Sequence, residues 1–115
     1  MSIVRHQPAK ILSGAVEANG MVYVAGTVAD TRPASVRAQT EEILGRIDAL
    51  LAQAGSHKSR IVSAQIWLAD MRTREEMNQA WLAWVDPANL PARACVEAKL
   101  AGADMLVEIA VIAAK

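Results

Sequence analysis

The largest group of chemically useful side chains lies in the segment from Pro91 to Lys99. Polar or reactive residues alternate there with Ala and Val, at Arg93, Cys95, Glu97 and Lys99. Because side chains alternate between the two faces of a β-strand, we expect these four on one face. Arginine suits a carboxylate, since its planar guanidinium donates two parallel hydrogen bonds. The segment therefore indicates an anion pocket at Arg93, and the alternative is a solvated strand face with a half-buried Cys95.

Glu108 is the second candidate, because it is the charged residue within the apolar segment from Met105 to Ala114. We expect this segment to be an antiparallel neighbour of the Arg93 strand (Ala92 to Lys99), since only a short stretch, 100–104, separates the two. A carboxylate in an apolar strand needs a partner, either Arg93 as a structural ion pair or a water molecule that it activates. The residues alone leave both roles open.

The elements that must position these residues follow from periodicity and turn signals. Asn19-Gly20 between two apolar runs predicts a hairpin over 14–27. Apolar residues at steps of three and four predict a helix from Val36 to Ala54 that ends at Gly55. A β-branched, alternating run predicts a strand from Ile61 to Leu68. Thr73 with Glu76 has the form of a capping box, which predicts the start of a second helix.

This order of elements, with an additional strand at Ile3 to Arg5, predicts an α+β fold: an antiparallel-rich sheet with both helices on one face. The last strand is apolar on both sides except at Glu108, so its second face should meet another subunit. The length predicts a single domain over residues 1–115. We expect the larger aromatic side chains in the core, namely Tyr23, Trp67, Trp81 and Trp84.

The composition narrows the classes of partner. Lys plus Arg and Asp plus Glu each number 12, which argues against binding to nucleic acid or to an acidic membrane surface. Apolar runs fall short of the ~20 residues of a membrane span, and no secretory signal is recognisable, so we expect a cytoplasmic protein. Cys95 is the single cysteine, and His6 and His57 lie far apart in the sequence, so no metal site is predicted.

The sequence resembles the Rid family (RidA-like, YjgF-type) of reactive-intermediate imine and enamine deaminases in several segments, including those that carry Arg93 and Glu108. The similarity runs nearly end to end, through Tyr23 to Val28, Asp48 to Gly55, Lys58 to Ala64, Met77 to Trp81 and Pro91 to Glu97. Its most specific part is Pro-x-Arg-x-x-Val-Glu at residues 91–97, followed by the apolar strand that carries Glu108.

The resemblance implies a chorismate-mutase-like fold in a homotrimer, whose sheets form a central barrel and whose ligand clefts lie at subunit interfaces. It implies hydrolysis of 2-imino or enamino acids, such as 2-aminoacrylate or 2-iminopropanoate, to 2-keto acids and ammonia, with no metal or organic cofactor. By the family pattern Arg93 fixes the substrate carboxylate, Cys95 lines the pocket, Gly26 beside Ala25 contacts the ligand, and Glu108 orients the attacking water.

The chain departs from the family pattern at two places. Ser13-Gly14 stands where many members have Gly-Pro-Tyr, and Ala25-Gly26-Thr27 replaces the usual Ser-Gly-Gln. Two other functions are alternatives to deamination. One is a trimer that binds small keto acids without catalysis. The other is an endoribonuclease or translation inhibitor, an activity attached to relatives, which the balanced charge disfavours.

Overall fold

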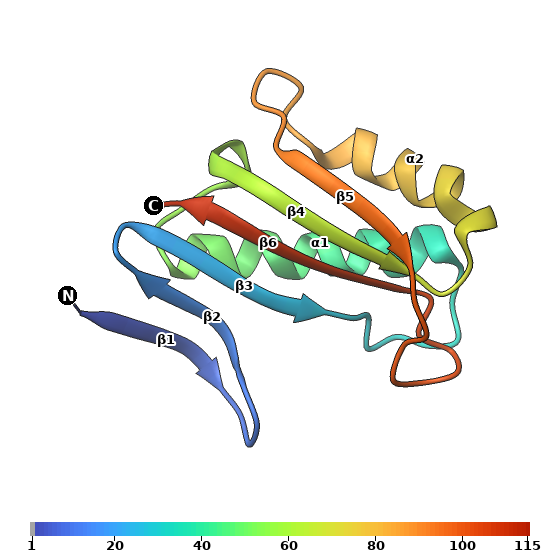
Figure 1. The fold of residues 1–115 in the computed structure, drawn as a ribbon, viewed down its shortest axis with the longest axis horizontal. Coiled ribbons are helices and arrows are strands. Elements are labelled where there is room, and N and C mark those ends of the chain that lie inside the picture. The colour runs from blue at the N-terminus through green and yellow to red at the C-terminus, as the bar shows by residue number, and fades with distance from the viewer. Residues whose placement is uncertain (1) are drawn as a thin grey trace.

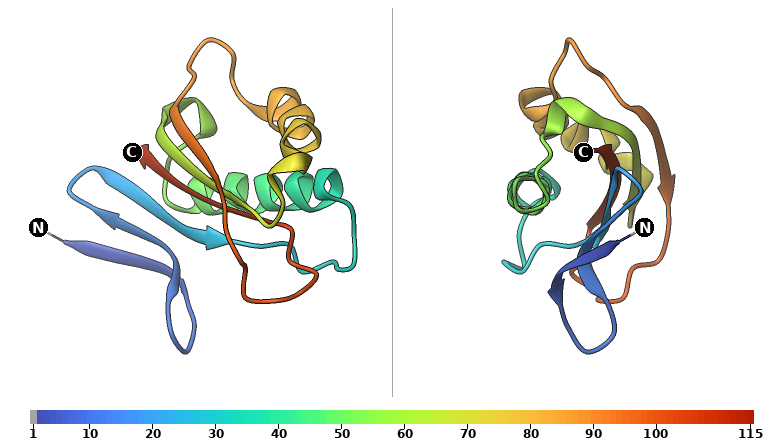
Figure 2. Two further views of the ribbon diagram at one scale, coloured as in Figure 1. Left: turned by 45° about the vertical axis from the view of Figure 1, so that its right-hand side comes forward. Right: turned by 90° about the vertical axis from the view of Figure 1, so that its left-hand side faces the viewer.

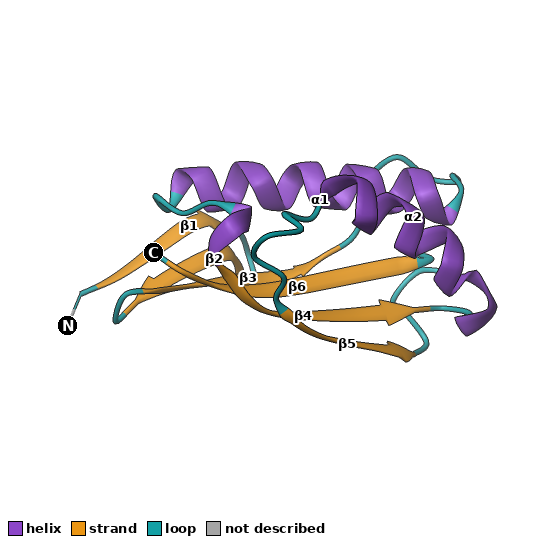
Figure 3. Ribbon diagram, turned by 90° about the horizontal axis from the view of Figure 1, so that it is seen from above, coloured by secondary structure: helices purple, strands orange, loops and turns teal. Residues whose placement is uncertain are grey.

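A computed structural model describes residues 2–115 and shows two helices on one face of a six-stranded mixed sheet (Figures 1 and 3). The strand order is β1-β2-β3-β6-β4-β5. This arrangement confirms the predicted α+β class. The strands are β1 (Ile3–Pro8), β2 (Ser13–Ala18), β3 (Met21–Thr27), β4 (Ile61–Leu68), β5 (Ala92–Glu97) and β6 (Val107–Ala114), and the helices are α1 (Val36–Gln53) and α2 (Arg74–Trp84).

The turn between β2 and β3 is the one that Asn-Gly predicts. Asn19 and Gly20 both have positive φ, 54° and 77°, a conformation that these two residue types adopt at low cost. The hairpin pairs Ala18 with Met21. The preceding hairpin of β1 and β2 extends past the helical layer at one edge of the sheet (Figures 1 and 2).

Helix α1 supplies most of the helical side of the core. The Ser35 side chain caps its first turn by accepting a hydrogen bond of 3.0 Å from the Ala38 backbone N–H, and Gly55 follows its end with a φ of 76°. Its buried stripe meets the inward residues of β4 and β6 in the centre of the molecule. The fully buried members include Ile43, Ile47, Leu51, Ile66, Ile109 and Val111.

The predicted capping box of α2 is wrong. Thr73 precedes the helix but makes no side-chain cap, and its hydroxyl donates instead to the Asp70 carbonyl at 2.7 Å. Glu76 accepts a hydrogen bond of 2.8 Å from the Arg37 backbone N–H, which lies in the first turn of α1. The physical reason is that α1 also presents unpaired N–H groups at its start, where a carboxylate is favourable. Glu76 therefore joins the two helices.

The predicted pairing of the last two strands is also wrong. β5 pairs with β4 in parallel, with Ala64 opposite Arg93, and β6 pairs with the other edge of β4, with Trp67 opposite Glu108. The chain between β5 and β6, residues 98–106, passes across the end of β4 (Figure 2). β4 and β6 are the more apolar strands, so they take the buried centre, and β5 with its polar positions takes the edge.

The face of the sheet that no helix covers, called the open face below, is partly apolar (Figure 3). The side chains of β6 point alternately to the two faces, as the sequence predicted; those on the helical side are buried and those on the open face are half-buried. Tyr23 and Trp67 also lie there rather than in the core, and Tyr23 is 45% exposed. Trp81 and Trp84, by contrast, pack against the core from α2 as expected.

Candidate functional site

Arg93 extends from the edge strand β5 towards α2. Its Nη1 donates a hydrogen bond of 2.8 Å to the Asn78 side-chain oxygen, and its guanidinium carbon lies 5.3 Å from the centroid of the Trp81 ring. Both contacts come from α2, one turn apart on the same side of the helix. The parallel pairing of β5 with β4 thus places the arginine under a helix that holds its guanidinium in one orientation.

Within the described residues the Arg93 charge has no acidic partner. Among residues 2–115 no carboxylate lies within ion-pair distance of its guanidinium. Burial, which removes water from the charged form, lowers the pKa of Arg93, and the nearby Arg74 lowers this pKa further, whereas the electrostatic interaction with Cys95 acts in the opposite direction. A guanidinium stays protonated at neutral pH all the same. Arg93 is therefore a half-buried cation whose remaining N–H groups are available to an anion.

A cavity of about 350 Å³ opens beside this cation. We call it the Arg93 cavity. It is lined by Glu75, Asn78, Trp81, Leu82, Val85, Leu90, Pro91 and Arg93. Of these residues the sequence singled out Arg93 as functional and Trp81 only as core. Asn78 was missed, because it lies beside the apolar stripe of α2 and its role depends on which strand the helix covers.

The other polar residues of the β5 segment have different surroundings. Cys95 shares the Arg93 face and packs half-buried against the core, but it does not line the Arg93 cavity. The Glu97 carboxylate accepts a hydrogen bond of 2.9 Å from the Met71 backbone N–H, so it anchors the turn before α2. Lys99 lies beyond the end of β5 and is exposed. Of the four polar residues of this segment, Arg93 thus belongs to the candidate site, whereas Cys95 and Glu97 make structural contacts.

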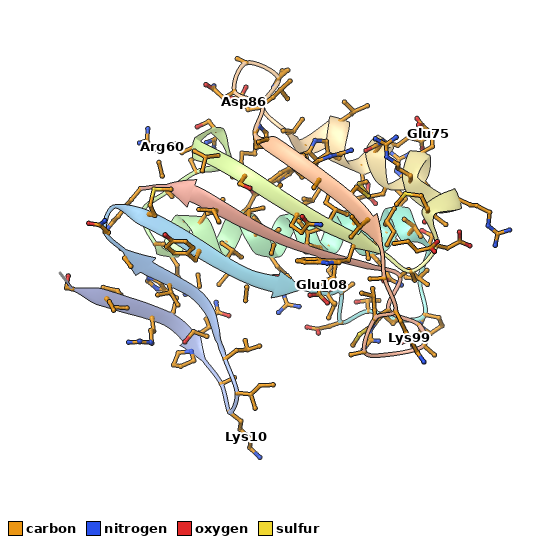
Figure 4. All side chains as sticks on the ribbon, in the orientation of Figure 1. Lys10, Arg60, Glu75, Asp86, Lys99 and Glu108 are labelled. Atoms are coloured by element: carbon orange, nitrogen blue, oxygen red, sulfur yellow. The ribbon has the colours of Figure 1, made fainter. Side chains whose placement is uncertain are left out.

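Glu108 lies on the open face, near the end of β3 (Figure 4). A Cβ atom at Gly26 would overlap the Glu108 carboxylate. Gly26 belongs to an irregularity in the pairing of β3 with β6, between Val24 and Thr27. Ala25, half-buried beside it, accepts a hydrogen bond of 2.9 Å from the Thr27 hydroxyl at its carbonyl. A glycine at 26 is what allows the carboxylate to lie against the β3 backbone.

The structure does not bring Arg93 and Glu108 together within one chain. Arg93 is opposite Ala64 and Glu108 is opposite Trp67, and these two β4 residues point to opposite faces of the sheet because they are an odd number of positions apart. The sequence-based expectation that the two residues share a neighbourhood is therefore wrong for one copy of the chain, and the proposed structural ion pair between them is excluded there.

Two further properties of residues 2–115 bear on the site. No group of three or more His, Cys, Asp or Glu side chains in this range is arranged to hold a metal ion. Neither α1 nor α2 has the length and apolar character that a membrane crossing requires.

Comparison with known proteins gives concordant matches along the chain. Residues 3–115 match the family described as Endoribonuclease L-PSP. A RutC family protein of Haemophilus influenzae is 48% identical over 114 residues, covering 98% of both chains, and the RutC family protein YoaB of Escherichia coli is 40% identical, covering 99% of both.

The fold gives the same relationship. A crystal structure of a YjgF family member from Neisseria meningitidis superimposes with a TM-score of 0.97 at 41% identity, covering 100% of this chain and 96% of that one. Sequence and fold thus agree over essentially the whole length, and the chain belongs to the YjgF/RutC family of RidA-like proteins.

Proposed function

We propose that the protein hydrolyses reactive 2-imino or enamino acids, such as 2-iminopropanoate or 2-aminoacrylate, to 2-keto acids and ammonia. The observation that carries this proposal is the half-buried Arg93 guanidinium, which Asn78 orients and which has no acidic partner within residues 2–115. A substrate carboxylate would accept two parallel hydrogen bonds from the N–H groups that Asn78 leaves available.

The main contribution of the protein to this reaction is to position the substrate and the attacking water. An enamine first becomes the imine by taking up a proton at carbon and releasing one from nitrogen. Water then adds to the electrophilic imine carbon to give a carbinolamine, whose nitrogen takes up a proton and leaves as ammonia while the C=O bond forms. Holding the carboxylate at Arg93 fixes the carbon in place, so that a nearby carboxylate side chain needs only to orient the water and relay its proton. No step in this scheme requires a metal ion or an organic cofactor.

We assign to Glu108 the role of the carboxylate that orients the water and relays its proton. Because it lies on the opposite sheet face from Arg93 in one chain, the assignment requires the Glu108 of a neighbouring copy to approach Arg93. A contact between two different surfaces of identical chains generates a closed ring when the rotation permits. The partly apolar open face with Tyr23 and Trp67 supports such an assembly, and we propose a homotrimer with a site at each interface.

Gly26 and Ala25 complete the proposed site on the Glu108 side. The missing side chain at Gly26 leaves room for the Glu108 carboxylate beside the β3 backbone, and we propose that a ligand meets both groups there. Cys95 has a supporting place in this proposal, since it lies on the same strand face as Arg93 and packs against the core. In this proposal Arg93 of one copy binds the substrate carboxylate, and Glu108 of the neighbouring copy orients the water.

The test generates 2-aminoacrylate in the presence of the purified protein and measures how fast ammonia is released. Light scattering at micromolar concentration reports the assembly in the same sample. Faster ammonia release from a trimer supports the proposal. Binding of pyruvate without faster ammonia release would identify a keto-acid-binding protein instead, and a monomeric mass would remove the shared site.

A further inference from the structure

Two large apolar side chains on the wall of the Arg93 cavity are left uncovered by the described chain. Leu82 on α2 is 70% exposed and Leu90, in the loop after α2, is 67% exposed. Leu82 lies off the buried stripe of its helix, which comprises Met77, Ala80 and Trp81. A single exposed leucine is ordinary, but two from separate elements, beside a cation that has no acidic partner among residues 2–115, form the kind of wall that binds an apolar group.

The lining changes character along α2. Its first half contributes Glu75 and Asn78, its second half contributes Trp81 and Leu82, and Val85 directly follows its end. Arg93 lies at the boundary, since it contacts both Asn78 and Trp81. A ligand with its carboxylate on Arg93 therefore has polar residues towards the start of α2 and apolar residues towards its end.

We infer that this cavity selects 2-imino acids with branched aliphatic or aromatic side chains over the smallest members of the class. The inference rests on the proposed function. The cavity volume of about 350 Å³ is near the lower end of the ~300–1,000 Å³ range of small-molecule pockets, which suits a molecule of amino-acid size. The methyl group of 2-iminopropanoate would leave most of the wall formed by Leu82 and Leu90 unused.

The expected selectivity follows from apolar burial. Each methylene transferred from water to an apolar wall is worth about a fourfold gain in binding, so an isobutyl side chain should gain roughly 10- to 50-fold over methyl. The gain should appear in kcat/KM, because the side chain stays in the cavity from binding to the transition state.

The experiment compares imino acids made in the assay by an amino acid oxidase from leucine and from alanine. Semicarbazide competes for each imine, so enzymatic hydrolysis is measured as a lower rate of semicarbazone formation. We expect a leucine-to-alanine ratio of kcat/KM of about 10 or more, and a ratio about tenfold lower in the double variant Leu82→Ser with Leu90→Ser. Both side chains are largely exposed, so the variant should fold.

Ile3→Ser is the matched control, because Ile3 is 48% exposed and lies on β1, outside the Arg93 cavity. It should keep the wild-type ratio. Equal kcat/KM for the two substrates, or a ratio that the leucine variant leaves unchanged, would overturn the inference while leaving deamination in place.

A binding measurement separates this inference from the proposed function. Calorimetry compares 4-methyl-2-oxopentanoate with pyruvate on wild type and on the leucine variant. If neither imine is hydrolysed but the branched keto acid binds about tenfold more tightly through Leu82 and Leu90, the cavity selects as inferred and only the catalysis is absent. Equal affinities for the two keto acids would refute the selectivity whatever the catalytic result.

Discussion

Replacing Arg93 with alanine should remove activity while costing the fold little. On the substrate side the change removes two charge-assisted hydrogen bonds, each worth about 1.5–3 kcal/mol, so kcat/KM should fall roughly 10²- to 10⁴-fold. On the protein side it removes the bond to Asn78 and the contact with Trp81, but it also relieves the burial of an unpaired charge. We expect a net loss of stability of about 1–2 kcal/mol, or roughly 4–8 °C in Tm.

The assay pairs ammonia release from an enzymatically generated imino acid with thermal melting and light scattering on the same preparations. Arg93→Lys tests geometry separately from charge, and it should recover little activity because an ammonium lacks the planar donor fork. Arg74→Ala is the matched control, since Arg74 is an exposed cation close enough to lower the pKa of Arg93 but does not line the cavity. Wild-type kcat/KM in a properly assembled Arg93→Ala protein would refute the assignment.

Three further predictions concern other parts of the chain. Cys95→Ser should retain most activity, because hydrolysis of an imine by water needs no thiolate nucleophile; a covalent adduct on Cys95 seen by mass spectrometry during turnover would contradict this. Gly26→Ala should lower kcat/KM about 10- to 100-fold with little change in Tm, because the new Cβ displaces the Glu108 carboxylate; unchanged kinetics would show that Glu108 has no positional role. The Lys115 ammonium holds the pKa of Glu17 below its usual range, so the pair stabilises the fold above the unfolded pKa of about 4.3 and loses this effect as the pH falls through the lower folded value. The Tm difference between wild type and Glu17→Gln should accordingly shrink on acidification, and a difference independent of pH would rule out this linkage.

The positions of the individual elements could be predicted from the sequence because they depend on local signals. Asn19-Gly20 specifies its turn by tolerating positive φ at both positions. The apolar period of α1 and the alternation in β4 and β6 identify which side of each element is buried. The same alternation correctly placed Arg93 and Cys95 on one face of their strand.

The relation between elements came only from the tertiary structure. Alternation tells which residues share a face within a strand, but it does not tell which strand is the neighbour. β4 lies between β5 and β6 because apolar strands bury the most surface in the centre of the sheet. This strand order puts Arg93 and Glu108 on opposite faces.

The same reasoning applies to the partners of polar side chains. The sequence pairs Glu76 with Thr73, yet the carboxylate caps α1 instead, because the packing of the two helices brings the Arg37 N–H group within reach. Asn78 orients Arg93 only because α2 lies over the parallel strand β5. Residue types and local periods thus determined what each side chain can do, whereas the packing of distant segments decided which groups meet, since such contacts depend on the whole chain and not on neighbours in sequence.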